Sequence, residues 1–439
     1  MKNLFLSIFI AVLLPGNPMN AQEDNVWSLE ECISYALEKN IQVRKSELAN
    51  QRNQYYADQA KAQRFPSLNA SLNHNFSWSK SDGEGQTGYS GINGSNVSVN
   101  SGVTLFNASR ITNQIKQADL DLQAGQYSLE TVRESVSLSI LEAYLQVLYA
   151  EEQVKNSIRQ IESTSGQVDL AAERLAVQLI SQADYAQVKA QLASEKLTLA
   201  NSENQLAIAK VNLEQLMELP VSESFAIVHP EFGEQVNQHR LPDVMLIYEM
   251  ALGIKPQVKA AEVSRQIASL DEKIARAGYF PTLSASAGIG TSYSSRLTDP
   301  YFSQLDKGLS PSLGFSLTIP VYQKKQVRTG VAVAKAGYRD AELNEIDTRN
   351  GLRKNIEQAC VDVTSAQVKY EASLEKYNAT EVSAALSDEK FRQGLINSVD
   401  YLVSKTSLIV AESELLQARY NLIFSYKVLD FYQGVPLVL

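Results

Sequence analysis

The sequence predicts a mainly α-helical chain that also carries a membrane β-barrel portion. Three observations support this fold class: four segments alternate apolar and polar residues, helical patterns run for about 70 residues, and the second half of the chain repeats the first. The composition is that of a globular protein, with 44% hydrophobic and 20% charged residues. A net charge of −9 without any basic tract argues against a nucleic-acid partner.

The N-terminus has the pattern of a secretory signal peptide. Lys2 precedes a short apolar run from Leu4 to Leu14, and the small residue Ala21 ends the predicted signal segment at 1–21. This run is too short to cross a bilayer as a helix, and no later stretch reaches the roughly 18 apolar residues required. We therefore expect an exported chain that can cross a membrane only with strands.

Two sequence blocks recur along the chain. Phe65-Pro66 is found again 215 residues later as Phe280-Pro281. Further along, the spacing becomes 216 residues, and the matching residues are Leu179, Ile180, Asp184 and Tyr185 with Leu395, Ile396, Asp400 and Tyr401. Chance similarity between helices would give scattered matches, so these blocks indicate an internal duplication.

Each copy is predicted to run as helix, β-hairpin, long helix and helix. The first copy occupies 22–217, with its hairpin at 67–106, and the second occupies 243–439, with its hairpin at 282–322. An inter-repeat linker at 218–242 contains several prolines, which favours an irregular segment.

The helices of the first copy have recognisable ends. Ser28 and Glu31 have the spacing of a capping box, and Pro66 stops the helix that leads into the hairpin. After the hairpin, one helix is predicted from about Asn107 to Val177 and a second from about Ser181 to Met217.

The four strand segments each have one apolar and one polar face. Their apolar faces contain, in chain order, Leu68, Ala70, Leu72, Phe76 and Trp78; Val97, Val99, Val103 and Leu105; Leu283, Ala285, Ala287, Ile289 and Tyr293; and Leu313, Phe315, Leu317, Ile319 and Val321. The polar faces carry no charge, and aromatic residues cluster at the strand ends. We interpret the strands as lipid-facing and the segments between them, 79–96 and 294–311, as surface loops.

Four strands are too few to close a barrel. An open sheet edge in lipid would leave backbone groups without hydrogen bonds. If these hairpins span a membrane, several protomers must therefore share one barrel, with eight strands from two chains or twelve from three.

The long helices exceed the size of a compact domain. At about 1.5 Å per residue, a 70-residue helix spans roughly 100 Å. Apolar positions along it step by threes and fours, and a second stripe of Ile140, Tyr144 and Leu148 lies beside the first. Two stripes indicate neighbours on two sides, as in a cylinder of helices.

The turn that ends each long helix carries the sharpest local motif. In the second copy, Gly394 can take the left-handed conformation that ends a helix, and Asn397 can cap the next helix with Asp400 in its first turn. The corresponding residues of the first copy are Gln178, Ser181 and Asp184. Because the first copy lacks the glycine, we expect the two tips to differ in gating or in partner contact.

At these residues the chain resembles the TolC-like outer membrane efflux protein family. The resemblance covers nearly all of the chain after the signal peptide and rests on the duplication, the helix-Phe-Pro-strand junctions, the hairpins and the tips. It implies a homotrimer with a twelve-stranded barrel in the outer-membrane lipid and a helical tunnel through the periplasm of a Gram-negative bacterium. It further implies contact with a periplasmic adaptor (membrane fusion) protein and an inner-membrane transporter, and passive transport without cofactor or catalysis.

The resemblance also assigns candidate site residues. Asp400 matches an acidic position of the family's periplasmic gate, and Asp184 is its repeat mate; capping alone would also explain both. The candidates for adaptor contact at the helix tips are Gln178, Leu179, Ile180, Ser181, Gly394, Leu395, Ile396 and Asn397. Where some members carry a tyrosine, an arginine and a second aspartate, this chain has Phe391, Ile396 and Val403. We therefore expect the tip to be closed by apolar packing of Leu179, Ile180, Leu395 and Ile396.

Residues typical of other chemistry are sparse. His74, His229 and His239 have no metal-ligand spacing with one another or with Cys32 and Cys360, and the two cysteines are expected to be buried thiols. No phosphate loop or nucleophile motif is present, so no enzyme activity is expected.

The sequence leaves two alternatives to a small-molecule efflux duct. One is a type I secretion duct, which has the same architecture and passes proteins. The other is a periplasmic coiled-coil structural or adaptor protein, although an adaptor would normally show one helical hairpin rather than two complete copies.

Overall fold

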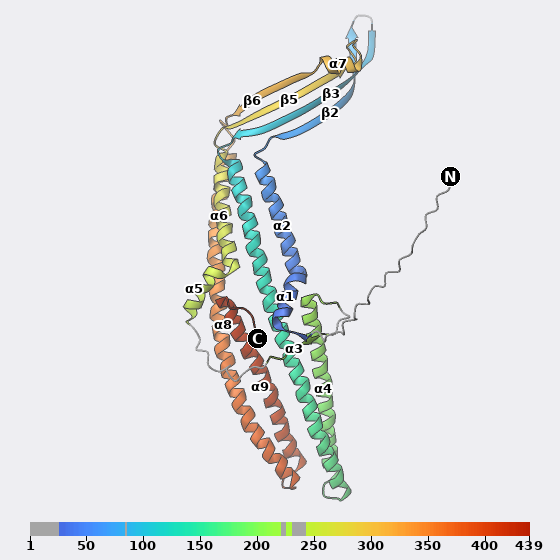
Figure 1. The fold of residues 1–439 in the computed structure, drawn as a ribbon, viewed down its shortest axis with the longest axis vertical. Coiled ribbons are helices and arrows are strands. Elements are labelled where there is room, and N and C mark those ends of the chain that lie inside the picture. The colour runs from blue at the N-terminus through green and yellow to red at the C-terminus, as the bar shows by residue number, and fades with distance from the viewer. Residues whose placement is uncertain (1–25, 84–85, 221–224, 231–242) are drawn as a thin grey trace, which may run out of the picture.

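The computed structural model describes residues 26–83, 86–220, 225–230 and 243–439. The molecule is elongated, with a sheet at one end and two helical hairpins at the other (Figure 1). The predicted signal segment 1–21 and much of the predicted linker lie outside the described residues. None of the helices in the described part of the chain combines the length and hydrophobicity that a bilayer crossing needs.

The helices of the two halves correspond in order and in length. The first half contains α1 (Leu29–Lys39), α2 (Ile41–Ala62), α3 (Arg110–Ala176) and α4 (Gln182–Met217), and the second contains α5 (Val244–Ile254), α6 (Pro256–Ala277), α8 (Gln326–Arg392) and α9 (Ser398–Gln433). Corresponding helices have 11, 22, 67 and 36 residues in both halves. At about 1.5 Å per residue, α3 and α8 each span roughly 100 Å. The repeat boundaries at 217 and 243 stay predictions.

Capping residues define the first two helices. Ser28 and Glu31 form the predicted capping box at the start of α1. Asn40 ends α1 and caps α2, because its side-chain oxygen accepts a hydrogen bond from the backbone of Gln42. The Asn40 side-chain nitrogen also donates to the Leu216 carbonyl at 2.8 Å. This one residue therefore links the α1–α2 break to the end of α4.

The sheet contains β2 (Ser67–Gly83), β3 (Gln86–Phe106), β5 (Thr282–Ser294) and β6 (Ser310–Thr318). The spatial order is β2-β3-β5-β6, and all neighbours are antiparallel. Directly paired residues lie on the same face. The register therefore places the predicted apolar residues within the paired strands, apart from Leu105, on one common face, and in the single chain most of the large ones are exposed. Ile319 and Val321 lie beyond the end of β6.

The register differs from the prediction at the end of β3. A bulge between Thr104 and Phe106 brings Phe106, rather than Leu105, opposite Leu283. A bulge inserts one extra residue and so reverses the alternation beyond it. Phe106 therefore joins the apolar face.

The predicted loop at 79–96 is wrong, because β2 and β3 continue through most of it. Their ladder extends to the Gly83–Gln86 pair. Small polar residues pair through the backbone as well as apolar ones do, so polarity alone did not mark the end of the strands. The sheet hydrogen bonds of β6 end at Thr318 rather than at 322, since Pro320 has no backbone donor.

The second predicted loop, 294–311, contains a short helix. This helix, α7 (Tyr301–Lys307), lies beside the distal end of the sheet (Figure 1). The structure thus replaces a predicted irregular segment with an ordered element against β5.

The predicted irregular linker also contains a strand. β4 (Ala226–Ile227) pairs in parallel with β1 (Val26–Trp27). The Tyr144 hydroxyl of α3 lies 2.7 Å from the Val228 carbonyl and 3.2 Å from the Trp27 carbonyl. The start of the first half and the linker are therefore fastened to the same point of α3.

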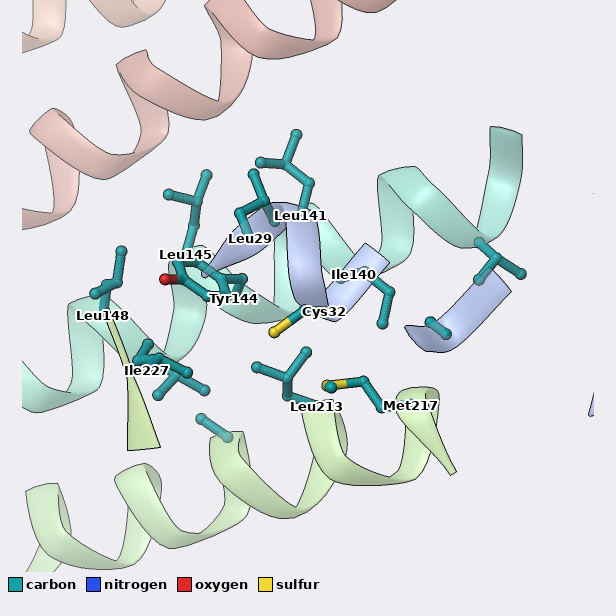
Figure 2. Packing of buried hydrophobic residues seen from close by; sticks show 14 of the residues in the cluster. Leu29, Cys32, Ile140, Leu141, Tyr144, Leu145, Leu148, Leu213, Met217 and Ile227 are labelled. Carbon is teal, nitrogen blue, oxygen red and sulfur yellow. The ribbon is translucent and has the colours of Figure 1, made fainter. Parts of the chain in front are cut away.

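The principal core lies where α1, α3, α4 and β4 meet (Figure 2). The predicted second stripe of α3, Ile140, Tyr144 and Leu148, is fully buried there. Cys32 lies in this core, and burial raises the pKa of its thiol to about 12. Cys360 lies in a separate cluster with Ile356 and other residues of α5, α8 and α9, so the prediction of two buried free thiols is confirmed.

The junction from strand to long helix has an unusual backbone in both halves. Ala108 and Ser109 have φ of 52° and 63°, and Lys324 and Lys325 have φ of 49° and 65°. None of these residues is glycine, so each left-handed position costs about 1 kcal/mol. The same turn thus occurs twice on unrelated residues, which indicates that the geometry of the junction is required.

Candidate functional site

The helical hairpin tips lie at the end of the molecule farthest from the sheet (Figure 1). The α3–α4 turn closes with hydrogen bonds from Gln178 N to Leu175 O and from Leu179 N to Arg174 O. The α8–α9 turn has the same two bonds at the equivalent positions, from Gly394 N to Phe391 O and from Leu395 N to Lys390 O. Both helices therefore end in the same C-terminal motif.

The missing glycine of the first copy does not change the backbone. Gln178 has a φ of 61°, and Gly394 has a φ of 72°. A glutamine in this conformation is strained by about 1 kcal/mol, whereas glycine is not. The two tips therefore differ in side chains and in local strain, while their turn geometry is shared.

Asp184 takes part in a cap and in a contact between the tips. Its carboxylate accepts hydrogen bonds from the Ser181 hydroxyl at 2.7 Å and the Ser181 backbone at 3.3 Å, completing a capping box. The other carboxylate oxygen accepts from the Ser398 hydroxyl of α9 at 2.6 Å. The Ser398 hydrogen bond, followed by those from Ser181, lowers the pKa of Asp184. Asp184 is therefore held as an anion at the junction of the two hairpins.

Asp400, the repeat mate of Asp184, has a different environment. Its backbone N–H donates to the Asn397 side chain at 2.9 Å, as the sequence predicted for a capped helix. The Asp400 side chain is exposed, and within the described residues its carboxylate accepts no hydrogen bond. Capping thus accounts for Asn397 and leaves the Asp400 carboxylate available for another role.

The predicted apolar closure is not formed within one chain. Leu179 is 73% exposed and Leu395 is 69% exposed. Ile396 is half-buried and packs on Phe391, Tyr401 and Leu402. Both leucines are therefore left uncovered by the rest of this chain.

A polar network joins the two hairpins on the side of α3. The Arg174 guanidinium donates to the carbonyl oxygens of Phe391, at 3.1 Å, and of Arg392. The same guanidinium lies 5.7 Å from the centre of the Phe391 ring. The ring stacks on Tyr401 with a centroid separation of 4.7 Å. A single arginine of the first copy therefore holds the end of α8 in place.

A second set of contacts lies one to two turns farther from the tip. The Gln167 amide donates to Asp388 Oδ1 at 3.2 Å and to the Tyr401 hydroxyl. Burial raises the pKa of Tyr401 to about 12, so this hydroxyl stays protonated. Asp388 also pairs with Arg392 at 2.8 Å. This set fixes α3 against both helices of the second hairpin.

Lys405 forms the most buried polar contact between the hairpins. Its ammonium donates to the Thr164 hydroxyl of α3 and lies 3.8 Å from Glu195 Oε1 of α4. Burial lowers the pKa of Lys405, and the carboxylates of Glu195 and Asp388 oppose that shift. Removing one member of such a buried pair leaves an uncompensated polar group, so the contact favours one relative position of the hairpins.

The same side chains line an open groove between α3, α8 and α9. The groove has a volume of about 820 Å³, and its wall includes Gln167, Arg174, Asp388, Phe391, Tyr401 and Lys405. It contains both charges and aromatic rings, which suits a polar protein surface better than a small apolar ligand.

Sequence reasoning identified the turn residues but not this network. Arg174 and Phe391 are 217 residues apart, and Gln167 and Tyr401 are 234 apart, so no local spacing relates them. The one available signal was the replacement by Phe391 of the tyrosine found in some members of the resembled family. This replacement predicted that the tips lack polar contacts with each other. The structure instead has polar contacts between the hairpins from Arg174 and Gln167.

Two of the three histidines make separate local contacts in the described residues. No group of three or more His, Cys, Asp or Glu there has metal-binding geometry. His74 bonds to the Ser95 hydroxyl at 2.7 Å, and His229 lies 2.7 Å from Glu151. His239 lies outside the described residues.

Comparison with known proteins gives a consistent result. The model of the family described as outer membrane efflux protein matches residues 32–218 and 247–434. The outer membrane protein TolC of Escherichia coli is 25% identical over 96% of this chain and 84% of its own length. The pyoverdine export outer membrane protein OpmQ of Pseudomonas putida is 24% identical over 69% of this chain and 62% of its own length. The crystal structure of CusC has the same fold, with a TM-score of 0.81 at 17% identity, covering 93% of this chain and 92% of CusC.

Proposed function

The chain belongs to the outer membrane efflux protein family, and from that membership we propose that it is the exit duct of a tripartite efflux system for small molecules. The family places it in the outer membrane with its helices extending into the periplasm. One observation carries the proposal: a single chain combines an exposed apolar sheet face with helices that are roughly 100 Å long. We propose that the duct itself catalyses no reaction and takes no cofactor.

The proposed duct is a homotrimer. In the described residues, β2 and β6 are the outer strands of a four-stranded sheet, and each pairs on one side only. Lipid cannot satisfy the hydrogen-bonding groups of those edges, so β6 of one chain must pair with β2 of the next. Three chains give a twelve-stranded barrel, which is within the size range of membrane barrels.

The proposed periplasmic gate uses Asp400. Its carboxylate is exposed and is not required for the cap, whereas Asp184 is fully engaged by Ser181 and Ser398. Three symmetric copies of Asp400 would form an acidic ring that favours cations. The exposed Leu179 and Leu395 would pack between neighbouring chains at the same level.

The proposed adaptor contact covers the tips and the adjoining groove. The tip candidates are Gln178, Leu179, Ile180, Ser181, Gly394, Leu395, Ile396 and Asn397. The groove beside α3, α8 and α9 adds charged and aromatic side chains to that surface. An adaptor that is attached to an inner-membrane transporter could thus hold the tips and pull the two hairpins apart.

Two experiments test the proposal. Outer-membrane fractions of expressing cells should contain a trimer-sized band on an unboiled gel that collapses to the monomer on boiling. A soluble periplasmic monomer would overturn the channel and would favour the coiled-coil alternative. Cells that lack the gene should become sensitive to small toxic compounds, whereas loss of a protein from the medium without such sensitivity would favour a type I secretion duct.

The gate assignment has its own test. The Asp400→Ala variant should have a higher single-channel conductance in planar bilayers than the parent. The matched Asp184→Ala variant should lose tip stability before it changes ion preference. Unchanged conductance in Asp400→Ala would remove Asp400 from the gate.

A further inference from the structure

Helix α7 occupies a position for which the duct function gives no reason. It lies at the distal end of the sheet, between β5 and β6 in the chain, where the described residues of the first hairpin are all in extended strands (Figure 1). The long helices of the two halves correspond in length, whereas the strands of the first hairpin have 17 and 21 residues and those of the second have 13 and 9. An ordered helix that occurs in one hairpin only calls for a role at that place.

The contacts of α7 show which face of the sheet it covers. The Thr291 hydroxyl of β5 donates to the Leu305 carbonyl at 2.6 Å, and the Tyr301 ring lies 4.6 Å from that of Tyr293. Tyr293 and Ser95 are a register pair, and both have the parity of the apolar face. The helix therefore lies on the face that the other strand positions turn toward lipid.

A polar set beneath α7 locks it against the strands. The Tyr301 hydroxyl lies 3.3 Å from the Ser95 hydroxyl, which is itself 2.7 Å from His74. The buried Gln304 side chain accepts from Ser294 N at 2.9 Å and donates to the Asp299 carbonyl at 2.7 Å. These hydrogen bonds satisfy the polar side chains on an otherwise apolar face. They also hold α7 in one position against the strands.

The outer surface of α7 and its flanks exposes three large apolar side chains beside the charged side chains of Arg296, Asp299, Asp306 and Lys307, a mixture that suits a membrane interface. Phe302 is 81% exposed, Leu297 is 63% exposed and Leu309 is 57% exposed. The Asp299 and Lys307 side chains pair with each other at 3.2 Å, which cancels their charges. Three large exposed apolar side chains within one short segment are unfavourable in water, because their apolar surface stays hydrated.

The level of α7 along the strands fits a membrane boundary. From Thr282 at the helical end of the sheet to Thr291 beneath α7, β5 has about the 9–11 residues with which a tilted strand crosses the apolar layer. The helices extend into the periplasm, so α7 lies at the opposite, outer boundary. Aromatic residues favour that boundary in membrane barrels.

We propose that α7 is a lipid-interface anchor, in which Phe302, Leu297 and Leu309 insert into the headgroup–acyl boundary of the outer leaflet. The occupant of this surface is lipid, because α7 lies on the same face of β5 as Ala287 and Ile289, the face that the proposed barrel turns toward lipid. The anchor would fix the height of the barrel in the membrane and limit its tilt. This inference rests on the proposed membrane function of the strands.

The test measures the depth of α7 in a bilayer. The chain has two tryptophans, Trp27 and Trp78, so a background of Trp27→Phe with Trp78→Phe permits a single probe. Phe302→Trp in this background would be reconstituted in phosphatidylcholine nanodiscs with bromines either near the headgroups or deep in the acyl chains. Because interfacial side chains insert about 5–10 Å, emission should fall by roughly half with shallow bromines and less with deep ones.

Two control variants separate the anchor from the membrane function itself. Leu313→Trp lies in β6 on the apolar face opposite Ala287 and should be quenched most by deep bromines. Val382→Trp lies on an exposed position of the periplasmic helix α8 and should not be quenched. If Leu313→Trp is quenched and Phe302→Trp is not, the anchor is overturned and the barrel stands. If neither is quenched, the membrane function fails.

A second probe guards against a folding defect. Leu309→Trp should show the same preference for shallow bromines if Phe302→Trp fails to assemble. Blue-shifted emission from both probes without quenching by either lipid would mean that protein covers α7, either a second copy or another partner, and would also overturn the lipid assignment.

Discussion

The two helical hairpin tips of this chain share the backbone of the turn and differ in the contacts of their side chains. Gln178 and Gly394 occupy the same left-handed turn position. The α3–α4 tip has Asp184 inside a capping box that also reaches Ser398, whereas the Asp400 carboxylate of the α8–α9 tip accepts no hydrogen bond among the described residues. The turn backbone was therefore kept in both copies, whereas the side-chain roles differ between them. The first tip supplies contacts, and the second tip supplies a free carboxylate and an apolar core.

The largest expected effect concerns the apolar core, which only the second tip has. Phe391→Ala should lower the free energy of opening of the α8–α9 tip by about 3 kcal/mol, because a buried aromatic ring leaves a cavity. Leu175→Ala at the equivalent, half-buried position should cost only about 1 kcal/mol. Hydrogen exchange followed by mass spectrometry measures both. Equal losses of opening free energy in the two variants would show that the second tip has no special apolar core.

The next effect concerns the tie between the tips. Arg174→Ala removes the donor to the Phe391 and Arg392 carbonyls and should cost about 2 kcal/mol in tip opening. Lys390 is the repeat mate of Arg174 and is exposed, so Lys390→Ala should have an effect within about 0.5 kcal/mol of zero. The same exchange experiment applies. A comparable loss in Lys390→Ala would show that the tie is not specific to the first copy.

Substitution of Asp184 should change the stability of its tip, whereas substitution of Asp400 should change ion conduction. Asp184→Asn should destabilise the α3–α4 tip by about 1 kcal/mol, because it weakens a capping box and the bond from Ser398. Asp400→Asn should leave tip opening nearly unchanged and alter the cation preference of the channel. Reversal potentials in a salt gradient, measured beside hydrogen exchange, would distinguish the two outcomes. If Asp184→Asn alone changed ion preference, the assigned roles would be exchanged.

The backbone strain at Gln178 predicts a smaller effect, in which a substitution stabilises the tip instead of destabilising it. Gln178→Gly should stabilise the α3–α4 tip by up to about 1 kcal/mol, since glycine adopts a positive φ without a steric cost. Gly394→Gln should destabilise the other tip by a similar amount. The change in slow-exchanging amides of each turn measures both variants. Destabilisation by Gln178→Gly would mean that the glutamine side chain makes a contact that outweighs its strain.

The smallest effect is the pH dependence of the first tip. Because the pKa of Asp184 is lowered in the folded state, its contribution is present above the unfolded pKa of about 4 and is lost as pH falls through the folded pKa. The difference in thermal midpoint between the parent and Asp184→Asn should therefore shrink as pH is lowered from 6 to below about 4. Midpoints from circular dichroism, with Asp400→Asn as the matched control, test this. A difference that is constant with pH would contradict a charged Asp184.

Much of the fold could be predicted because its signals are local. The Ser28–Glu31 capping box and the Asn397 cap occur as expected, and so does the left-handed Gly394. Strand alternation gave the shared apolar face, since a period of two leaves little choice of register where one side meets lipid. The fold class of long helices with one four-stranded sheet is confirmed by the structure and its likeness to CusC, and the described residues also contain the short pair β1 and β4.

The rest depended on contacts that sequence spacing does not reveal. The extension of β2 to Gly83 and the start of β3 at Gln86 rest on backbone pairing, which leaves no side-chain pattern when both faces are polar. Helix α7 is only seven residues long, and its buried Gln304 looked like a loop residue. The network of Arg174 and Gln167 joins residues more than 200 positions apart. Local propensity specifies turns and caps, whereas packing between copies is a property of the assembled chain.

The equal lengths of the corresponding helices have an evolutionary consequence. A half-length ancestor with one hairpin would contribute two strands, so the proposed twelve-stranded barrel would have needed six identical subunits. Fusion of two such halves lowers the symmetry from sixfold to threefold without changing the wall of the tube. Once fused, the halves no longer had to obey the same constraints. Two differences between the halves are then explained by the loss of sixfold symmetry. Gln178 occupies the position equivalent to Gly394, and among the described residues α7 occurs in the second hairpin only.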